Sequence, residues 1–267
     1  MTLGPRVLVM GIVNVTPDSF SDGGVHLASA DAVAAAHRMA TEGADILDIG
    51  GESTRPGHSV ISADEEWARL APVLDQLERA GSNLPPVSID TWKAEVARRA
   101  LTRGAVIVND VWGFQRDPEI AAVTAEGGAA AILMHNRDAI DTSIDIVDDI
   151  LRFLERSLDI ARRAGVTDDR IVLDPGIGFG KSFSQSFQTL AALPRLKALG
   201  FPVLLGLSRK GFIGSLADPA TPAAERLGGT IAGNVYGALA GTDIIRVHDV
   251  APHVQALRML ARIEAAA

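Results

Sequence analysis

Polar side chains come directly after the apolar segments of this sequence, where they could act together on one ligand. Carboxylates and amides pair with the donors and acceptors of a neutral ring, whereas basic side chains hold anionic oxygens. Taken singly, such residues also fit the caps and turns that begin helices, but their repetition after eight apolar segments favours a shared binding site. The side chains concerned are Asn14, Asp48, Asp90, Asn109, Asp110, His135, Asp174, Ser208, Arg209, Lys210, Arg246 and His248.

Two glycine-containing loops add further groups to this candidate site. Residues 50–57 follow Asp48 and contain Thr54 and Arg55, which can bind anionic oxygens. Residues 14–24 form the second loop. A barrel with a purely structural role would not need two such loops, so we interpret them as lids over a binding site.

A third glycine-rich segment, residues 176–182, matches neither of the common nucleotide-binding motifs. A Walker loop needs a glycine five residues before Gly180, where Pro175 stands, and a dinucleotide fingerprint needs its last glycine where Lys181 stands. The segment is therefore either a flexible turn between a strand and a helix or a direct ligand contact.

Eight short aliphatic segments must position the polar side chains. They read as nearly continuous apolar runs rather than alternating patterns, which is typical of strands buried on both faces of a parallel sheet. The predicted strands are residues 7–13, 46–49, 87–89, 106–108, 130–133, 171–173, 203–207 and 244–247.

Helical patterns with recognisable ends lie between the predicted strands. Ser62 and Glu65 form a predicted capping box, and Pro72 predicts a kink or an early break in the helix that follows. Further helices are predicted at residues 93–103, from Asp117 and Pro118 onward, at 144–164, at 188–199 and at 221–240.

This alternation predicts an α/β protein, a single (β/α)8 TIM barrel that spans residues 1–267 as one domain. A doubly wound open sheet is the alternative. In a barrel the C-terminal ends of the strands meet at one rim, where the active sites of this fold are built. The polar residues would lie at that rim, so the predictions of fold and site support each other.

The composition narrows the class of function. Of the 267 residues 47% are hydrophobic and 22% are charged, which suits a large core and excludes a disordered chain. A net charge of −8 argues against nucleic acid or an acidic membrane surface and favours a small-molecule ligand. The sequence has no cysteine, which excludes disulfides and thiolate chemistry. Because we find no secretory signal and no long apolar run, we expect a cytoplasmic protein.

Several of these segments resemble, in order, the signature segments of the dihydropteroate synthase family. The matching runs cover essentially the whole chain and are residues 14–24, 50–57, 88–91, 109–110, 133–135, 173–182, 206–210 and 246–249. The resemblance implies condensation of 6-hydroxymethyl-7,8-dihydropterin pyrophosphate with p-aminobenzoate, giving 7,8-dihydropteroate and pyrophosphate in folate synthesis. It also implies Mg²⁺ as cofactor, a homodimer, and competition by sulfonamides, which mimic p-aminobenzoate.

The resemblance further implies a role for each matching residue. The pterin would be bound by Asp90, Asn109, Met134, Asp174 and Lys210, and the pyrophosphate by Thr54, Arg55, Arg246 and His248. The p-aminobenzoate would lie near Arg55, Pro56, Phe179 and Ser208, Asn14 would bind Mg²⁺, and Phe20 with Asp22 would close the first loop over the site. The catalytic groups would be Asp90, Lys210, Arg246 and His248.

Two other functions fit part of this pattern. A related pterin-binding barrel transfers a methyl group from methyltetrahydrofolate to a corrinoid protein, but it has no need for Arg246, His248 or the loop with Thr54 and Arg55. A paralogue that binds pterin without catalysis is the second, because fold and binding residues do not prove activity. Release of pyrophosphate by the purified protein would distinguish a synthase from both.

Overall fold

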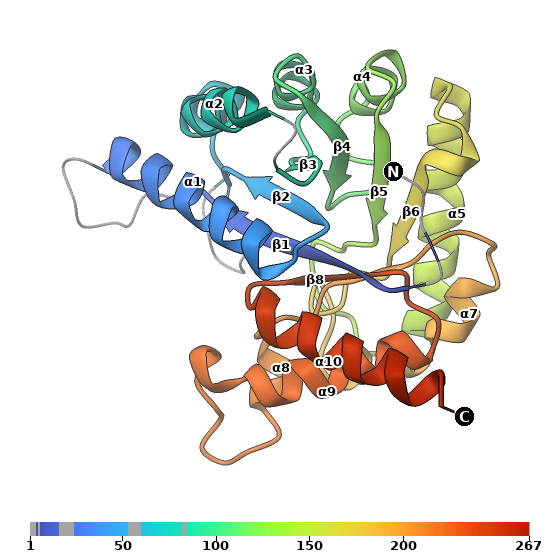
Figure 1. Ribbon diagram of the computed structural model, residues 1–267. Coiled ribbons are helices and arrows are strands. Elements are labelled where there is room, and N and C mark those ends of the chain that lie inside the picture. The colour runs from blue at the N-terminus through green and yellow to red at the C-terminus, as the bar shows by residue number, and fades with distance from the viewer. Residues whose placement is uncertain (1–3, 5, 16–23, 53–59, 82–83, 267) are drawn as a thin grey trace.

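The chain folds as a ring of parallel strands surrounded by helices (Figure 1). This computed structural model describes residues 4, 6–15, 24–52, 60–81 and 84–266. The eight strands in these ranges are β1 (Leu8–Asn14), β2 (Ile46–Gly50), β3 (Val87–Asp90), β4 (Ala105–Asp110), β5 (Ala130–Met134), β6 (Ile171–Asp174), β7 (Leu204–Leu205) and β8 (Ile244–Val247). They confirm the predicted strands in order, although β7 is shorter than predicted.

The strands close into a barrel, which confirms the (β/α)8 prediction and excludes the open doubly wound sheet. Neighbouring strands follow the order β6-β5-β4-β3-β2-β1-β8-β7, so β6 and β7 must meet for closure. They meet through an isolated bridge between Leu173 and Val203 and a hydrogen bond of 2.9 Å from Leu173 N to Pro202 O. The barrel therefore has a seam between β6 and β7, where the backbone ladder is shortest.

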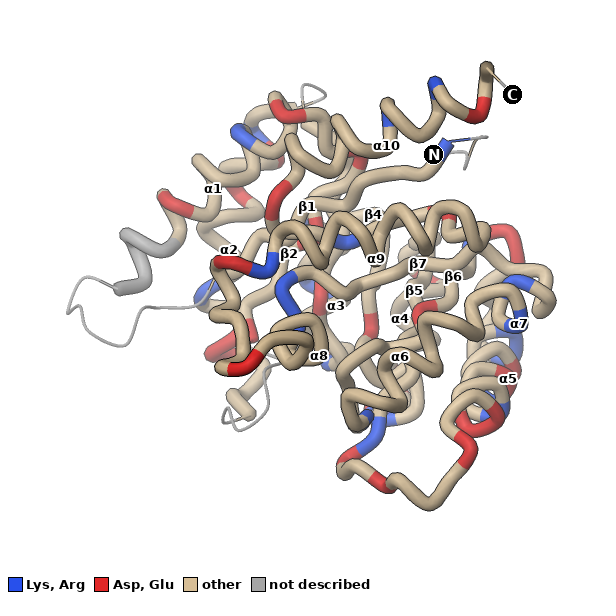
Figure 2. The backbone as a smooth tube through the Cα atoms, turned by 90° about the horizontal axis from the view of Figure 1, so that it is seen from below, with Lys and Arg blue, Asp and Glu red and all other residues tan. Residues whose placement is uncertain are grey.

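Helices cover the outside of this barrel (Figures 1 and 2). In Figure 2 charged positions lie on most of these helices, whereas α9 crosses the view without one. Within the described ranges, no helix combines the length and the apolar character needed to cross a membrane. The helices are α1 (Gly24–Glu42), α2 (Ala63–Ala80), α3 (Ala94–Leu101), α4 (Ile120–Glu126), α5 (Ile146–Ala164), α6 (Phe183–Ala191), α7 (Leu193–Lys197), α8 (Gly211–Gly214), α9 (Leu227–Leu239) and α10 (Val250–Glu264).

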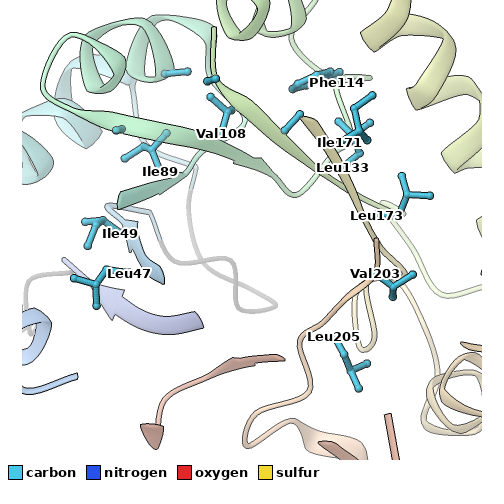
Figure 3. Close-up of a cluster of buried hydrophobic side chains, with 14 of the residues drawn as sticks. Leu47, Ile49, Ile89, Val108, Phe114, Leu133, Ile171, Leu173, Val203 and Leu205 are labelled. Atoms are coloured by element: carbon cyan, nitrogen blue, oxygen red, sulfur yellow. The ribbon is translucent and has the colours of Figure 1, made fainter. Parts of the chain in front are cut away.

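Alternate residues of each strand face two different cores, because side chains point to opposite faces with a period of two. One set, which includes Leu47, Ile49 and Leu133, packs outward beneath the helices (Figure 3). The other set fills the inside of the barrel. Its buried members are Leu8, Met10, Ile46, Ile107, Ile132, Val172, Leu204 and Ile244.

Helix α2 shows which of the predicted helix signals operate. Ser62 Oγ accepts a hydrogen bond of 3.1 Å from Glu65 N, as predicted, while the Glu65 carboxylate pairs with Arg69 at 2.7 Å. The helix continues past Pro72, so the predicted early break is wrong. The buried face of α2, with Leu70 and its neighbours, outweighs the one backbone hydrogen bond that a proline removes.

Four predicted helix starts are wrong because hydrogen bonds place them elsewhere. Helix α5 begins at Ile146 rather than at residue 144, since Asp145 caps it by accepting from Val147 N at 2.9 Å. Helix α4 begins at Ile120; the Asp117 carboxylate accepts from Glu119 N at 3.0 Å, as an N-cap would, but it also accepts from Ala94 N of α3 at 2.8 Å. Helix α6 begins at Phe183, five residues before the predicted start at 188, because Ser182 and Gln185 form a complete capping box. The helix predicted from 221 begins only at Leu227, after a short 3₁₀ turn (Ala223–Glu225).

Candidate functional site

Inward-facing residues change from apolar to polar toward the C-terminal ends of the strands. The residue two positions after an inner apolar residue also points into the barrel. By this rule Asp48 stands above Ile46 and Arg246 stands above Ile244. Asn109 and Asp174 follow inner residues of β4 and β6 in the same way. The sequence alternation therefore brings the predicted ligand-binding side chains to one end of the barrel.

A hydrogen-bonded cluster links four strands at this end. Arg246 donates from Nε to Asp48 Oδ2 at 2.6 Å and from a terminal nitrogen to Asp90 Oδ2 at 2.7 Å. Asn109 Nδ2 donates to the same Asp48 oxygen at 3.0 Å. Asp48 is fully buried, whereas the Arg246 side chain is 20% exposed. Asp48 thus holds both Arg246 and Asn109, while the Arg246 side chain stays partly exposed to solvent.

The electrostatics of this cluster leave one carboxylate close to neutrality. Burial raises the pKa of Asp90 to about 7, against the opposing charge of Arg246 and with the charge of Asp48 acting in the same direction as burial. Burial alone would lower the pKa of Arg246, but Asp48 and Asp90 raise it above its ordinary value. Arg246 therefore stays charged while Asp90 can change its protonation state near pH 7.

A second group of side chains lies around the turn that follows β6. Asp174 Oδ1 accepts from Gly176 N at 2.7 Å, and burial raises the pKa of Asp174 although the Lys210 charge opposes it. The Lys210 ammonium donates to Ile177 O and lies 4.5 Å from the centre of the Phe179 ring. Burial lowers the pKa of Lys210 to about 8. The predicted residues Asp174, Lys210 and Phe179 are therefore neighbours.

Ser208 and His248 join the ends of β7 and β8. Ser208 Oγ lies 3.2 Å from His248 N, which donates to it, and 3.0 Å from His248 Nδ1. Ser208 is buried and His248 is half-buried. The structure thus places these two predicted residues in contact, on the same rim as Arg246.

Two further predicted residues stand at strand ends. Met134 is buried as the last residue of β5, at an inward position two residues after Ile132. Asn14 is exposed as the last residue of β1 and lies opposite Gly50 in the parallel ladder. Five other predictions, namely Phe20, Asp22, Thr54, Arg55 and Pro56, lie outside the described residues.

Three polar residues that follow strands serve the fold rather than the shared site. The Asp110 carboxylate accepts from Trp112 N at 2.7 Å and from Phe114 N at 2.8 Å, which confirms the reading of this residue as a turn former. Arg209 pairs with Asp249. His135 is buried and hydrogen-bonded on both ring nitrogens. These three polar strand ends therefore have their partners within the fold and are not members of the Arg246 cluster.

The glycine-rich segment after β6 is a turn held by hydrogen bonds. Lys181 Nζ donates to Gly176 O at 2.8 Å and to Phe179 O at 3.1 Å. A Cβ on Gly176 would stand 1.8 Å from His135 O, so glycine is required there. The segment is thus a turn between a strand and a helix, and its Phe179 lies beside Lys210; contact with a ligand stays a prediction.

Sequence reasoning gave no role to Asp48 within the site or to the buried residue Lys93. Asp48 was recognised only as a polar strand end, although its position two residues after Ile46 is a signal for an inward carboxylate. Buried Lys93 contacts both Glu52 and Glu66 and so ties the segment after β2 to α2. No pattern in the sequence announces this second cluster, because its members are far apart along the chain.

Comparison with known proteins identifies the family. The model of the pterin binding enzymes matches residues 10–248. A dihydropteroate synthase of Clostridium beijerinckii is 45% identical over 258 residues, which cover 96% of this chain and 94% of the relative. A Clostridium difficile dihydropteroate synthase, crystallised in the presence of pteroic acid, has a TM-score of 0.93 with 47% identity over 98% of both chains.

A Xanthomonas albilineans dihydropteroate synthase with 4-aminobenzoic acid gives a TM-score of 0.91 and 45% identity, and the match covers 98% of this chain and 94% of that one. These similarities extend over the whole barrel, including the strand ends that carry Asp90, Asn109, Asp174 and Arg246. The chain therefore belongs to the pterin-binding enzyme family and, within it, to the dihydropteroate synthases.

Proposed function

We propose that the C-terminal end of the barrel binds 6-hydroxymethyl-7,8-dihydropterin pyrophosphate and p-aminobenzoate and joins them with loss of pyrophosphate. As a dihydropteroate synthase the protein is a transferase of folate biosynthesis. The observation that carries the proposal is the cluster in which Arg246 bridges Asp48 and Asp90. It offers carboxylates for a ring beside a partly exposed cation for a leaving group.

The pterin suits the acidic and amide groups of this region. Its edge presents an amino group and ring nitrogens beside a carbonyl, and buried polar groups discriminate strongly against a ligand that leaves them unpaired. We assign Asp174 and Asn109 to the edge of the ring, Lys210 to its carbonyl side and Met134 to its face. Asp174 lies beside Gly206, since a Cβ built on this glycine would stand 3.8 Å from Asp174 Oδ2.

The reaction in this proposal is dissociative. The bond between the methylene carbon and the pyrophosphate oxygen breaks, and its electron pair leaves with the oxygen. The electron-rich dihydropterin, beside ionised Asp90, stabilises the resulting cation until the amine of p-aminobenzoate attacks and then loses a proton to water. Arg246 and His248 stabilise the charge that develops on the leaving group. No serine, cysteine or other covalent nucleophile is required.

The p-aminobenzoate would lie next to the turn after β6 and the end of β7. Phe179 is half-buried there beside Lys210, and buried Ser208 holds His248. We assign Phe179 and Ser208 to this substrate, together with Arg55 and Pro56. A sulfonamide is expected to compete for the same place because it resembles p-aminobenzoate.

The donor set fits the implied Mg²⁺. Mg²⁺ prefers oxygen ligands and is usually held by one or two protein groups together with substrate phosphates and waters. Asn14 presents an exposed amide at the end of β1, on the rim that carries Arg246. We propose that Asn14 and the pyrophosphate hold the ion, which when bound supplies Lewis-acid stabilisation of the pyrophosphate oxygens.

Release of pyrophosphate from purified protein with both substrates and Mg²⁺ tests this function. Asp174→Ala should abolish binding of the pterin, whereas His248→Ala should mainly weaken Mg²⁺-dependent binding of pyrophosphate. Asp243→Ala is a matched control, because Asp243 accepts from Lys197 and Val203 N before β8, at the opposite end of that strand from His248. Pterin binding without pyrophosphate release would favour the catalytically silent paralogue.

We also propose that the protein is a homodimer and works in the cytoplasm. Neighbouring helices α9 and α10 expose large apolar side chains that suit an interface between two copies. These are Tyr236, Leu239, Met259 and Ile263. Light scattering should report twice the chain mass for the wild type and a monomer for Leu239→Glu with Met259→Glu. Ile140→Glu, at an exposed apolar residue before α5, should stay dimeric; a monomeric wild type would refute the proposal.

A further inference from the structure

The ammonium group of Lys181 has three hydrogen-bond partners in the interior. Lys181 is 3% exposed, and its Nζ lies 2.8 Å from Gly176 O, 3.1 Å from Phe179 O and 2.7 Å from His135 Nδ1. An ammonium has three donors and no acceptor, so three acceptors satisfy it completely. Two of the three belong to the turn after β6, and the third belongs to the end of β5.

The direction of the hydrogen bonds through His135 follows from its other partner. His135 Nε2 lies 3.1 Å from Asp149 Oδ2, and an ionised carboxylate only accepts, so Nε2 carries the proton. Burial lowers the pKa of His135 to about 3, which keeps the ring neutral and leaves Nδ1 as an acceptor for Lys181. Arg137 donates to the same Asp149 oxygen at 2.7 Å. A continuous chain of hydrogen bonds thus runs from α5 to the turn.

The turn itself has little steric preference of its own. Gly176, Gly178 and Gly180 have φ values of +63°, +81° and +56°. Glycine adopts such angles freely but also leaves the unbound backbone with many alternatives. A turn of this kind needs contacts from outside to hold one conformation, and Lys181 binds it at the carbonyls of both Gly176 and Phe179.

Three residues of the turn contact or closely approach Lys210, which is assigned to the pterin. Ile177 O accepts from the Lys210 ammonium, the Phe179 ring lies 4.5 Å from that ammonium, and a Cβ on Gly178 would stand 3.2 Å from the Lys210 side chain. The turn therefore positions Lys210 as well as Phe179. A change in its shape would move one side chain assigned to the pterin and one assigned to p-aminobenzoate.

We infer that Lys181, held by His135 and Asp149, is a positioning residue that fixes the turn after β6 and so sets the places of Phe179 and Lys210. The inference rests on the proposed function for the roles of those two residues. It predicts that the chain from Asp149 to Lys181 affects substrate binding without touching substrate.

Lys181→Met removes the three donors and keeps the length of the side chain. The KM for p-aminobenzoate should rise roughly tenfold with a smaller change in kcat, as expected for the loss of hydrogen bonds that order a binding surface. The alkaline limb of the pH profile of kcat/KM should move to higher pH, because a freed Lys210 is better solvated. Lys197→Met is the matched control, since Lys197 pairs with Asp243 at the other end of the barrel and should keep wild-type kinetics.

Two variants of His135 keep the test decisive if Lys181→Met does not fold. Gln offers one acceptor for Lys181 and one donor for Asp149, whereas Leu offers neither. His135→Gln should therefore stay close to the wild type, and His135→Leu should reproduce the raised KM. Folded Lys181→Met with wild-type KM and pH profile, or equal effects of the two His135 variants, would overturn the inference.

A readout that does not depend on turnover separates this inference from the proposed function. Hydrogen exchange of the peptide that covers residues 174–183 should be faster in Lys181→Met than in the wild type and Lys197→Met. An inactive wild type with this exchange difference would refute the proposed function and support the positioning role. An active wild type with unchanged exchange in Lys181→Met would support the proposed function and refute the positioning role.

Discussion

Replacing Asp48 by Asn tests the central cluster with a nearly isosteric change. The fully buried carboxylate accepts from Arg246 Nε at 2.6 Å and from Asn109 Nδ2 at 3.0 Å, both on the same oxygen. An amide in its place carries no charge, and one of its two ends can only donate. Asp48→Asn therefore leaves Arg246 with Asp90 as its remaining carboxylate partner in the cluster.

The expected magnitude follows from the burial of the pair. Removing one partner of a buried ion pair costs about 3–5 kcal/mol. Arg246 keeps Asp90 and is 20% exposed, so the lower end of that range, about 3 kcal/mol, applies to the free energy of unfolding. If the same interaction holds Arg246 in the transition state, kcat/KM should fall on the order of 100-fold.

Steady-state release of pyrophosphate and urea unfolding measure the two effects separately. Asp110→Asn is the control, because Asp110 is an equally buried carboxylate at a strand end but accepts only backbone amides of its own turn. It should lose stability while its kcat/KM stays close to that of the wild type. Asp48→Asn with wild-type kcat/KM, or the same loss in both variants, would refute the view that Asp48 positions Arg246.

The site and the turn beside it give four further predictions. In the wild type, kcat/KM should rise near pH 7 as Asp90 ionises and fall above about pH 8 as Lys210 loses its proton, whereas a flat profile would contradict both assignments. Because the pKa of Asp90 lies above its ordinary 3.8, this group should lower folding stability as pH rises from about 4 to 7, measurable by urea unfolding. Gly176→Ala should destabilise the fold by more than about 3 kcal/mol, since its Cβ meets backbone, while Gly200→Ala, at positive φ in open space, should cost about 1 kcal/mol in the same assay. Removal of Mg²⁺ by EDTA should stop pyrophosphate release, and Asn14→Ala should need more Mg²⁺ to restore it; equal Mg²⁺ requirements would exclude Asn14 as a ligand.

The alternation of strands and helices was readable from the sequence because each strand is buried on both faces. Runs such as residues 130–133 and 171–173 are apolar throughout, and the polar residue that ends or follows most runs marks the rim. The first residues of the helices were harder to predict from the sequence. Asp117 fits an N-cap by type, yet its carboxylate binds Ala94 N of another helix, and that partner depends on tertiary structure.

The site was predictable where residue type and strand position agree, as for Asp90, Asn109 and Asp174. The sequence did not predict which charged residue holds the other side chains of the site in place. The strand period separates inward Asp48 from outward Asp110, but nothing in the sequence shows that Asp48 holds Arg246 or that Asp110 holds its own turn. Likewise Lys181 is one lysine among glycines in the sequence, and only the fold shows that His135 and two carbonyls surround it.

The seam between β6 and β7 divides the groups assigned to the pterin. Asp174 ends the strand on one side of it, and Lys210 follows the strand on the other side. A bound pterin that touches both would connect β6 and β7, the neighbouring strands with the shortest backbone ladder. Pterin binding should therefore slow hydrogen exchange of the Leu173 amide, which donates across the seam, more than exchange of amides between β1 and β2. The substrate would then stabilise the part of the barrel wall that binds it.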